Sequence, residues 1–112
     1  MRFSWPIMIR RVHGHSMVPV LPPGTLVLGW RWFTRLPPGK VIIFSRDGRE
    51  TIKRLDRVEL EGLIVLGDHP ETSTDSRHYG AIPRQSVESV VIWPRTAEVQ
   101  AEEPQLPDSP DK

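Results

Sequence analysis

The segment VIIFSRDGRETIKRL, residues 41–55, constrains the fold most strongly, because two β-rich runs flank the dipeptide Asp47-Gly48. Asp-Gly between such runs is typical of a two-residue type I′ hairpin loop. A two-residue loop also fixes the pairing register, so that the numbers of facing residues must add up to 95. This register places Lys53 in mid-strand opposite Ile42, which is an unusual position for an ammonium group.

Short β-rich runs separated by proline and glycine turns make up much of the remaining sequence. The tetrapeptide LPPG occurs at 21–24 and at 36–39, and the apolar runs TLVLGW and KVIIFS follow the two copies. Tandem prolines cannot continue a hydrogen-bonded ladder and the glycine supplies a turn, so each copy predicts a turn that leads into a strand.

Three further strands are expected. A second strand pair is predicted across Glu61-Gly62, with LIVLG returning, and the last strand is predicted at 89–94. Residues 3–9 predict a first strand or a surface anchor. The sequence therefore predicts a mainly β fold, a small coiled sheet or partly open barrel.

Composition and charge divide the chain into two parts. The 112 residues suffice for one domain, and the absence of cysteine excludes disulfides and thiolate zinc sites. Residues 96–112 contain five acids, three prolines and no aromatic residue, so we expect a disordered tail after a folded domain at 1–95. The whole chain has 15 Lys and Arg residues and 14 Asp and Glu residues. Without the five acids and the one lysine of the tail, 14 basic and 9 acidic residues remain, which gives the domain a net charge of +5. Such a charge is compatible with an anionic membrane surface or nucleic acid.

The sequence offers one aromatic candidate for contact with a membrane surface. No run of about 18 apolar residues is present, so no transmembrane helix is expected and a cytoplasmic or peripherally membrane-associated location is predicted. If WRWF at 30–33 is extended, Trp30 and Trp32 share one face, and Arg31 and Phe33 share the other. Two interpretations stay open, core packing and docking at a membrane interface or on a partner.

Ser16, within HGHSM, is a candidate nucleophile that requires a base, because a hydroxyl is weakly nucleophilic at its ordinary pKa. If residues 11–16 are extended, His13 and His15 share a face while Ser16 points to the other. A local Ser–His pair is then disfavoured, although a turn at Gly14 would remove this argument.

Lys53 is the second candidate base. Arginine stays protonated in practice, whereas burial can lower the pKa of a lysine from about 10.4 to roughly 7–8, where its amine can act as a base. The alternative is a lysine whose alkyl chain follows a half-exposed strand and whose amine lies in water.

Three motifs, in order, resemble those of type I signal peptidases and span about residues 12–93. GHSMVPVL (14–21) resembles the nucleophile motif Gly-x-Ser-Met-x-Pro-Thr-Leu, and IKR (52–54) resembles the strand that carries the lysine base. GDHPETSTDSRHYG (67–80) resembles the third motif, Gly-Asp-Asn-x-x-x-Ser-x-Asp-Ser-Arg-x-x-Gly.

The resemblance implies a signal-peptidase-like (LexA-like) catalytic domain and a serine endopeptidase that removes a signal or leader segment from a precursor protein, without a cofactor. It implies that Ser16 attacks the scissile carbonyl and that its backbone N–H is an oxyanion donor. Lys53 would be the base, and the hydroxyl of Ser73 would orient its amine. Further residues would support the site, namely Asp68, Asp75, Arg77 and Met17.

Several positions depart from the family pattern. Gly14 stands where some members carry a serine that completes the oxyanion hole, and Val20 replaces the usual threonine. His69 replaces the asparagine after Gly-Asp, while Thr25 and Lys40 replace aspartates that often follow the turn glycines. No apolar anchor precedes the serine in this sequence, which resembles the small soluble members identified as nickel-type superoxide dismutase maturation proteases.

Two other classes of function remain as alternatives. A catalytically silent module of the same fold would use its groove to hold an extended peptide by strand addition. His13 and His15, joined by His69 or His78, would instead form a metal site, but no carboxylate or cysteine has a recognised spacing to them. Nucleic-acid binding is not expected, because LexA-type repressors bind DNA through a separate helix-turn-helix domain for which this chain has no room.

Overall fold

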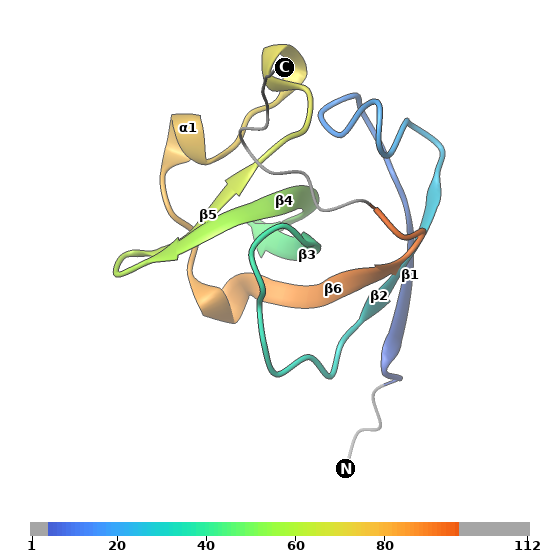
Figure 1. Cartoon of the computed structure of the whole chain (residues 1–112), viewed down its shortest axis with the longest axis horizontal. Coiled ribbons are helices and arrows are strands. Elements are labelled where there is room, and N and C mark those ends of the chain that lie inside the picture. The colour runs from blue at the N-terminus through green and yellow to red at the C-terminus, as the bar shows by residue number, and fades with distance from the viewer. Residues whose placement is uncertain (1–4, 97–112) are drawn as a thin grey trace, which may run out of the picture.

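The computed structural model describes residues 5–96 and shows a mainly β protein built on one six-stranded antiparallel sheet (Figure 1). The strand order is β1-β2-β6-β3-β4-β5. The strands are β1 (Ile7–Arg11), β2 (Leu26–Trp30), β3 (Val41–Arg46), β4 (Arg49–Glu59), β5 (Gly62–Leu66) and β6 (Val87–Trp93). Between β5 and β6 lie two 3₁₀ turns and a one-turn helix, η1 (Pro70–Thr72), α1 (Ser76–Tyr79) and η2 (Arg84–Ser86). Apart from Thr96, the tail predicted at 96–112 lies outside the described residues.

The β3–β4 hairpin has the register that the sequence predicts. Ile42 pairs with Lys53, Ile43 with Ile52 and Phe44 with Thr51. Asp47 and Gly48 have φ values of 52° and 77°, both in the left-handed region that a type I′ loop requires. The prediction is confirmed, and it fixes where Lys53 lies along β4.

The other predicted strands are present with shifted ends. Both LPPG segments lead into strands, β2 and β3. In the β4–β5 hairpin Glu59 pairs with Gly62, so the loop is residues 60–61 rather than the predicted 61–62. Gly62 belongs to β5 through its pairing with Glu59, and a side chain does not fit there because the Ile82 carbonyl oxygen would lie 2.4 Å from an added Cβ. β6 begins earlier than predicted because Val87 already pairs with β3 and is buried. The first strand spans Ile7–Arg11 rather than 3–9, and residues 3–4 lie outside the described residues.

β3 is buried on both faces and separates two apolar cores. Ile42 and Phe44 belong to one core, with Leu55, Val65 and Val90, whereas Val41 and Ile43 belong to the other, with Met17 and Val27. Successive side chains of a strand point to opposite faces, so this division follows from the sequence of β3. In Figure 1, β1 and β2 run across the direction of β4 and β5. The sheet thus bends enough to enclose apolar side chains on each side.

The aromatic segment at 30–33 is not extended throughout, because β2 ends at Trp30. Phe33 packs against the first core, while the rings of Trp30 and Trp32 meet edge to face with centroids 6.0 Å apart. Trp32 is 54% exposed, and Trp5 and Trp93 are also exposed. Core packing therefore applies to Phe33, and an exposed aromatic surface remains. Within residues 5–96, no helix has the length and apolar character needed to cross a bilayer.

Candidate active site

Ser16 lies in a turn that follows β1, so residues 11–16 are not extended throughout, and the turn at Gly14 that the sequence left open is present. β1 ends at Arg11, and Gly14 has a φ of 77°, which places it in the left-handed region and reverses the chain. Alternation of faces therefore does not decide where the histidines point. His13 and His15 are nonetheless exposed, and within residues 5–96 neither forms a hydrogen bond with Ser16. The histidines are not partners of Ser16, although the geometric reason differs from the one expected.

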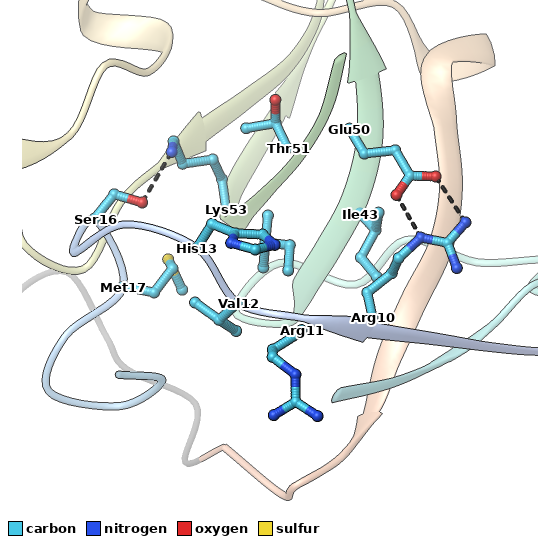
Figure 2. A pocket seen from close by; sticks show the side chains of 11 residues that line it. Arg10, Arg11, Val12, His13, Ser16, Met17, Ile43, Glu50, Thr51 and Lys53 are labelled. Carbon is cyan, nitrogen blue, oxygen red and sulfur yellow. Dashed lines mark hydrogen bonds and ion pairs between the residues drawn. The ribbon is translucent and has the colours of Figure 1, made fainter. Parts of the chain in front are cut away.

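Lys53 reaches Ser16 from the middle of β4. Its Nζ lies 3.0 Å from Ser16 Oγ, across 37 positions of sequence, and Figure 2 shows the two side chains meeting at one end of a cavity. Lys53 is only 6% exposed. The structure thus brings together the candidate nucleophile and the candidate base.

Burial lowers the pKa of Lys53 from its ordinary value of 10.5, and the negative charge of Asp75 offsets part of this effect. Among the described residues, no carboxylate forms an ion pair with Nζ that would hold the amine in its charged form. A neutral amine beside a hydroxyl can accept its proton, which is the requirement for general-base activation of a serine.

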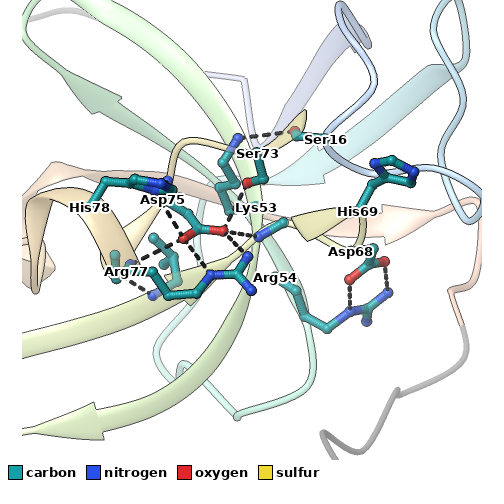
Figure 3. Close-up of polar contacts among 12 residues, drawn as sticks. Ser16, Lys53, Arg54, Asp68, His69, Ser73, Asp75, Arg77 and His78 are labelled. Carbon is teal, nitrogen blue, oxygen red and sulfur yellow. Dashed lines mark hydrogen bonds and ion pairs between the residues drawn. The ribbon is translucent and has the colours of Figure 1, made fainter. Parts of the chain in front are cut away.

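Asp75 organises the loop that faces Lys53 (Figure 3). Its carboxylate is fully buried and accepts hydrogen bonds from Gly67 N–H at 2.8 Å, Ser73 Oγ at 2.8 Å and Arg77 Nε at 2.9 Å. The backbone N–H and Nη2 of Arg77 also donate to it, and Asp75 caps α1. Burial alone would raise the pKa of Asp75, but the hydrogen bonds from Arg77, Gly67 and Ser73 hold it well below its usual range. Asp75 is therefore a permanent negative charge near the lysine.

Ser73 is buried beside the site, but its hydroxyl donates to Asp75 Oδ2. The resemblance implied that this hydroxyl orients the lysine amine, yet no hydrogen bond joins Ser73 to Lys53 within residues 5–96. The single proton of this hydroxyl goes to the Asp75 carboxylate, which is a strong acceptor. In this structure Ser73 helps to hold Asp75.

Gly67 connects the Ser16 turn to the third motif. A Cβ at Gly67 would lie 2.2 Å from Ser73 Oγ and 2.8 Å from the carbonyl oxygen of Ser16. The N–H of His69 donates a hydrogen bond of 2.8 Å to the same carbonyl oxygen of Ser16. Ser16 therefore has a fixed position against the loop, and only glycine fits at the contact. Gly67 was expected only as a member of the third motif, and the residues around it in the sequence do not indicate a close approach.

Asp68 belongs to a separate ion pair at the edge of the site. Arg54 donates to both of its oxygens, Nε to Oδ1 at 2.8 Å and Nη2 to Oδ2 at 2.7 Å. The same guanidinium donates to the carbonyl of Gly39 at 2.7 Å. Arg54 is buried, and it was not among the expected site residues. The pair joins the part of β4 that carries Lys53 to the third motif. The position of Arg54 directly after Lys53 was the available indication in the sequence.

Met17 anchors the Ser16 turn in the second core. It is 1% exposed, and its carbonyl accepts the N–H of Leu21, which is itself fully buried. Val20, which stands where the family pattern has threonine, packs against this core. Ser16 is thus followed by side chains that fix the turn through apolar contacts.

A cavity of about 270 Å³ extends from Ser16 and Lys53 (Figure 2). Residues 10–13 of β1 and the segment after it line one wall, and residues 50–53 of β4 line the other. The two walls are bridged by Arg10, whose Nη2 lies 2.9 Å from Glu50 Oε2. Among the described residues, the N–H of Ser16 has no hydrogen-bond acceptor.

The histidines do not form a metal centre in the described part of the chain. No group of three or more His, Cys, Asp or Glu side chains there is placed to hold a metal ion. His69 Nδ1 lies 3.0 Å from Thr72 Oγ1, and His78 Nδ1 accepts the N–H of Asp75 at 3.3 Å. Both imidazoles therefore have local roles in the loop.

A scan against protein-family models matches none of them. A search of curated proteins likewise gives no significant match. The interpretation of this site therefore depends on its geometry and on the resemblance of the three motifs.

Proposed function

We propose that this protein is a serine endopeptidase with a Ser16–Lys53 dyad on a signal-peptidase-like domain, a coiled sheet that forms a partly open barrel. One observation carries the proposal: Lys53 Nζ lies 3.0 Å from Ser16 Oγ, and the lysine is almost fully buried. Such burial favours the neutral amine, which a base of this kind requires.

The proposed reaction proceeds through an acyl-enzyme. The Lys53 amine takes the proton of Ser16 Oγ as this oxygen attacks the scissile carbonyl, and the Ser16 N–H donates to the resulting oxyanion. The ammonium then gives its proton to the leaving amine, and the carbon–nitrogen bond breaks to leave an ester on Ser16. Lys53 next takes a proton from water, whose oxygen attacks the ester carbonyl, and returning the proton to Oγ restores the serine.

The edges of the strands beside the cavity support binding of an extended peptide. β1 is the outer strand of the sheet, and β4 pairs with β5 only from Arg54 onward, so residues 49–53 pair with β3 alone. In an antiparallel pair, peptide groups alternate between the partner and the opposite edge. Arg46 and Arg49 flank the two-residue loop and therefore form a hydrogen-bonded pair with each other. Counting on from this pair, the peptide groups of Glu50 and Ile52 point away from β3. A substrate strand can form ladder hydrogen bonds there.

The substrate is a precursor protein that bears a leader or signal segment. The resemblance implies cleavage after small side chains. Trp5, Trp32 and Trp93 are exposed, and the ring of Trp32 meets that of Trp30 edge to face. Exposed tryptophan rings are suited to peripheral contact with a membrane interface. We include such contact in the proposal, since aromatic side chains favour the headgroup region.

Substitution of the dyad tests the proposal. Ser16→Ala, Lys53→Ala and Lys53→Arg should each abolish cleavage of a peptide library while circular dichroism stays unchanged. Ser45→Ala, at a half-buried serine on β3, should retain wild-type activity. Full activity of Lys53→Arg would exclude the lysine-base mechanism. Peptide binding without cleavage by the wild-type protein would favour the silent binding module.

A further inference from the structure

A second cavity lies beside β4, next to the one that contains the dyad. Its volume is about 570 Å³, and it is lined from the β3–β4 hairpin and from the third motif, by Arg46, Asp47, Arg49, Thr51, Thr74 and Tyr79. Thr51 also lines the cavity at Ser16 and Lys53. In Figure 2 the hydroxyl of Thr51 points away from Ser16. The two cavities therefore adjoin at Thr51.

Within residues 5–96, neither guanidinium group of the second cavity donates a hydrogen bond to a carboxylate. The guanidinium of Arg46 stacks 3.7 Å above the ring centroid of Tyr79, and Asp47 lies 3.7 Å from it, too far for a hydrogen bond. Within residues 5–96, the side chain of Arg49 forms no hydrogen bond or ion pair. Two positive charges and one exposed carboxylate give the cavity an excess of positive charge.

Three hydroxyl groups of the same cavity also lack partners. Tyr79 Oη is buried and has no hydrogen-bond partner among the described residues. The hydroxyls of Thr51 and Thr74 likewise form no hydrogen bond within residues 5–96. The donors of the two arginines and the hydroxyls of Thr51 and Thr74 together match an oxyanion.

We propose that this second cavity binds a carboxylate or a similar oxyanion, supplied by an acidic side chain of the peptide in the adjoining groove. The inference rests on the proposed peptidase function. Thr51 is two residues and Arg49 four residues from Lys53, or about 7 Å and about 13 Å along an extended strand. The acidic side chain would therefore lie two to four positions from the scissile bond. A free anion such as phosphate is the other source of the same chemistry.

Paired peptides test the role of an acidic residue. The peptides carry Glu or Gln at the second, third or fourth position on either side of the scissile bond. At one of these positions the wild-type protein should cleave the Glu peptide about tenfold more efficiently, as one charge-assisted hydrogen bond predicts. The variant Arg46→Gln/Arg49→Gln should lose this preference and cleave the Gln peptide normally. Arg35→Gln, at an exposed arginine between β2 and β3, should keep it.

Titration with inorganic phosphate provides a second measurement that does not depend on cleavage. Amide resonances of Thr51 and Thr74 should shift in the wild-type protein and not in the double variant. If phosphate binds and no peptide position prefers Glu, the anion is free and the substrate assignment is overturned. If neither phosphate binding nor a Glu preference is found, the site itself is overturned. If no peptide is cleaved at all, the proposed function fails, while the phosphate titration still decides whether the anion site exists.

Discussion

Replacement of Gly67 by alanine tests whether the contact between the Ser16 turn and the third motif fixes the dyad. The added Cβ would lie 2.2 Å from Ser73 Oγ, 2.5 Å from Ser73 Cβ and 2.8 Å from the Ser16 carbonyl oxygen. Ordinary contacts of this kind are about 3.5 Å, so the two segments must separate by about 1 Å. Overpacking of this extent should lower the free energy of unfolding by about 2 kcal/mol.

The same displacement should act directly on the reaction. Ser16 Oγ would move relative to Lys53 Nζ, which lies 3.0 Å away in the native structure. A misplacement of about 1 Å can reduce a rate by about 100-fold, so we expect kcat/KM to fall by about this factor. The assays are urea denaturation and peptide cleavage, both at a temperature where the variant is fully folded.

Gly29 provides a matched control in β2. A Cβ there would lie 2.2 Å from Ser89 Oγ and 2.8 Å from Ser89 Cβ, so Gly29→Ala introduces a similar clash away from the dyad. It should destabilise the protein to a comparable extent and leave kcat/KM of the folded protein near the wild-type value. Wild-type activity of Gly67→Ala, or equal loss of activity in both variants, would refute the reasoning.

Three further predictions concern charge and surface. Lys53→Met should raise the free energy of unfolding by about 1 kcal/mol at pH 6. Burial lowers the pKa of Lys53, which means that its charged form is penalised in the folded state. The gain in stability from Lys53→Met should therefore vanish as pH rises through the unfolded pKa near 10.5. A gain that is independent of pH in urea denaturation would contradict this. Asp75→Asn should lower the free energy of unfolding by about 3–5 kcal/mol. Because the Asp75 charge raises the pKa of Lys53, this variant should also shift the acid limb of the pH–rate profile to lower pH. A shift to higher pH would exclude this coupling. The double variant Trp32→Ala/Trp93→Ala should sediment less with anionic lipid vesicles than the control variant Val58→Ala, which changes an exposed apolar position on β4. Equal sedimentation of the two variants would exclude membrane contact through these tryptophans.

The β3–β4 register could be predicted from sequence because a two-residue loop leaves no freedom in pairing. This placed Lys53 opposite Ile42 in mid-strand before any tertiary contact was known. The turn around Ser16 was less predictable, because a glycine in a polar segment is compatible with either strand or turn, and Gly14 adopts a left-handed conformation. The approach of Ser16 to Lys53 depends on the strand order of the whole sheet, which local patterns do not determine.

The polar contacts of the third motif were also beyond sequence reasoning. The motif indicated that Ser73 and Asp75 belong together, but the choice of acceptor for a single hydroxyl proton depends on which groups the fold brings within reach. The Arg54–Asp68 pair joins β4 to a loop 14 positions away, and its only indication in the sequence was that Arg54 directly follows the candidate base. Residue types and spacing identified the participants, while their pairing required the structure.

Formation of an ester on Ser16 is the most direct test of the proposed mechanism. The protein is mixed with an activated ester of a short peptide that ends in alanine, and its intact mass is followed over time. We predict one acyl group that maps to Ser16, is released by hydroxylamine, is absent in Ser16→Ala and forms much more slowly in Lys53→Arg. Equal acylation of Ser16→Ala, or an unchanged rate in Lys53→Arg, would contradict the Ser16–Lys53 dyad.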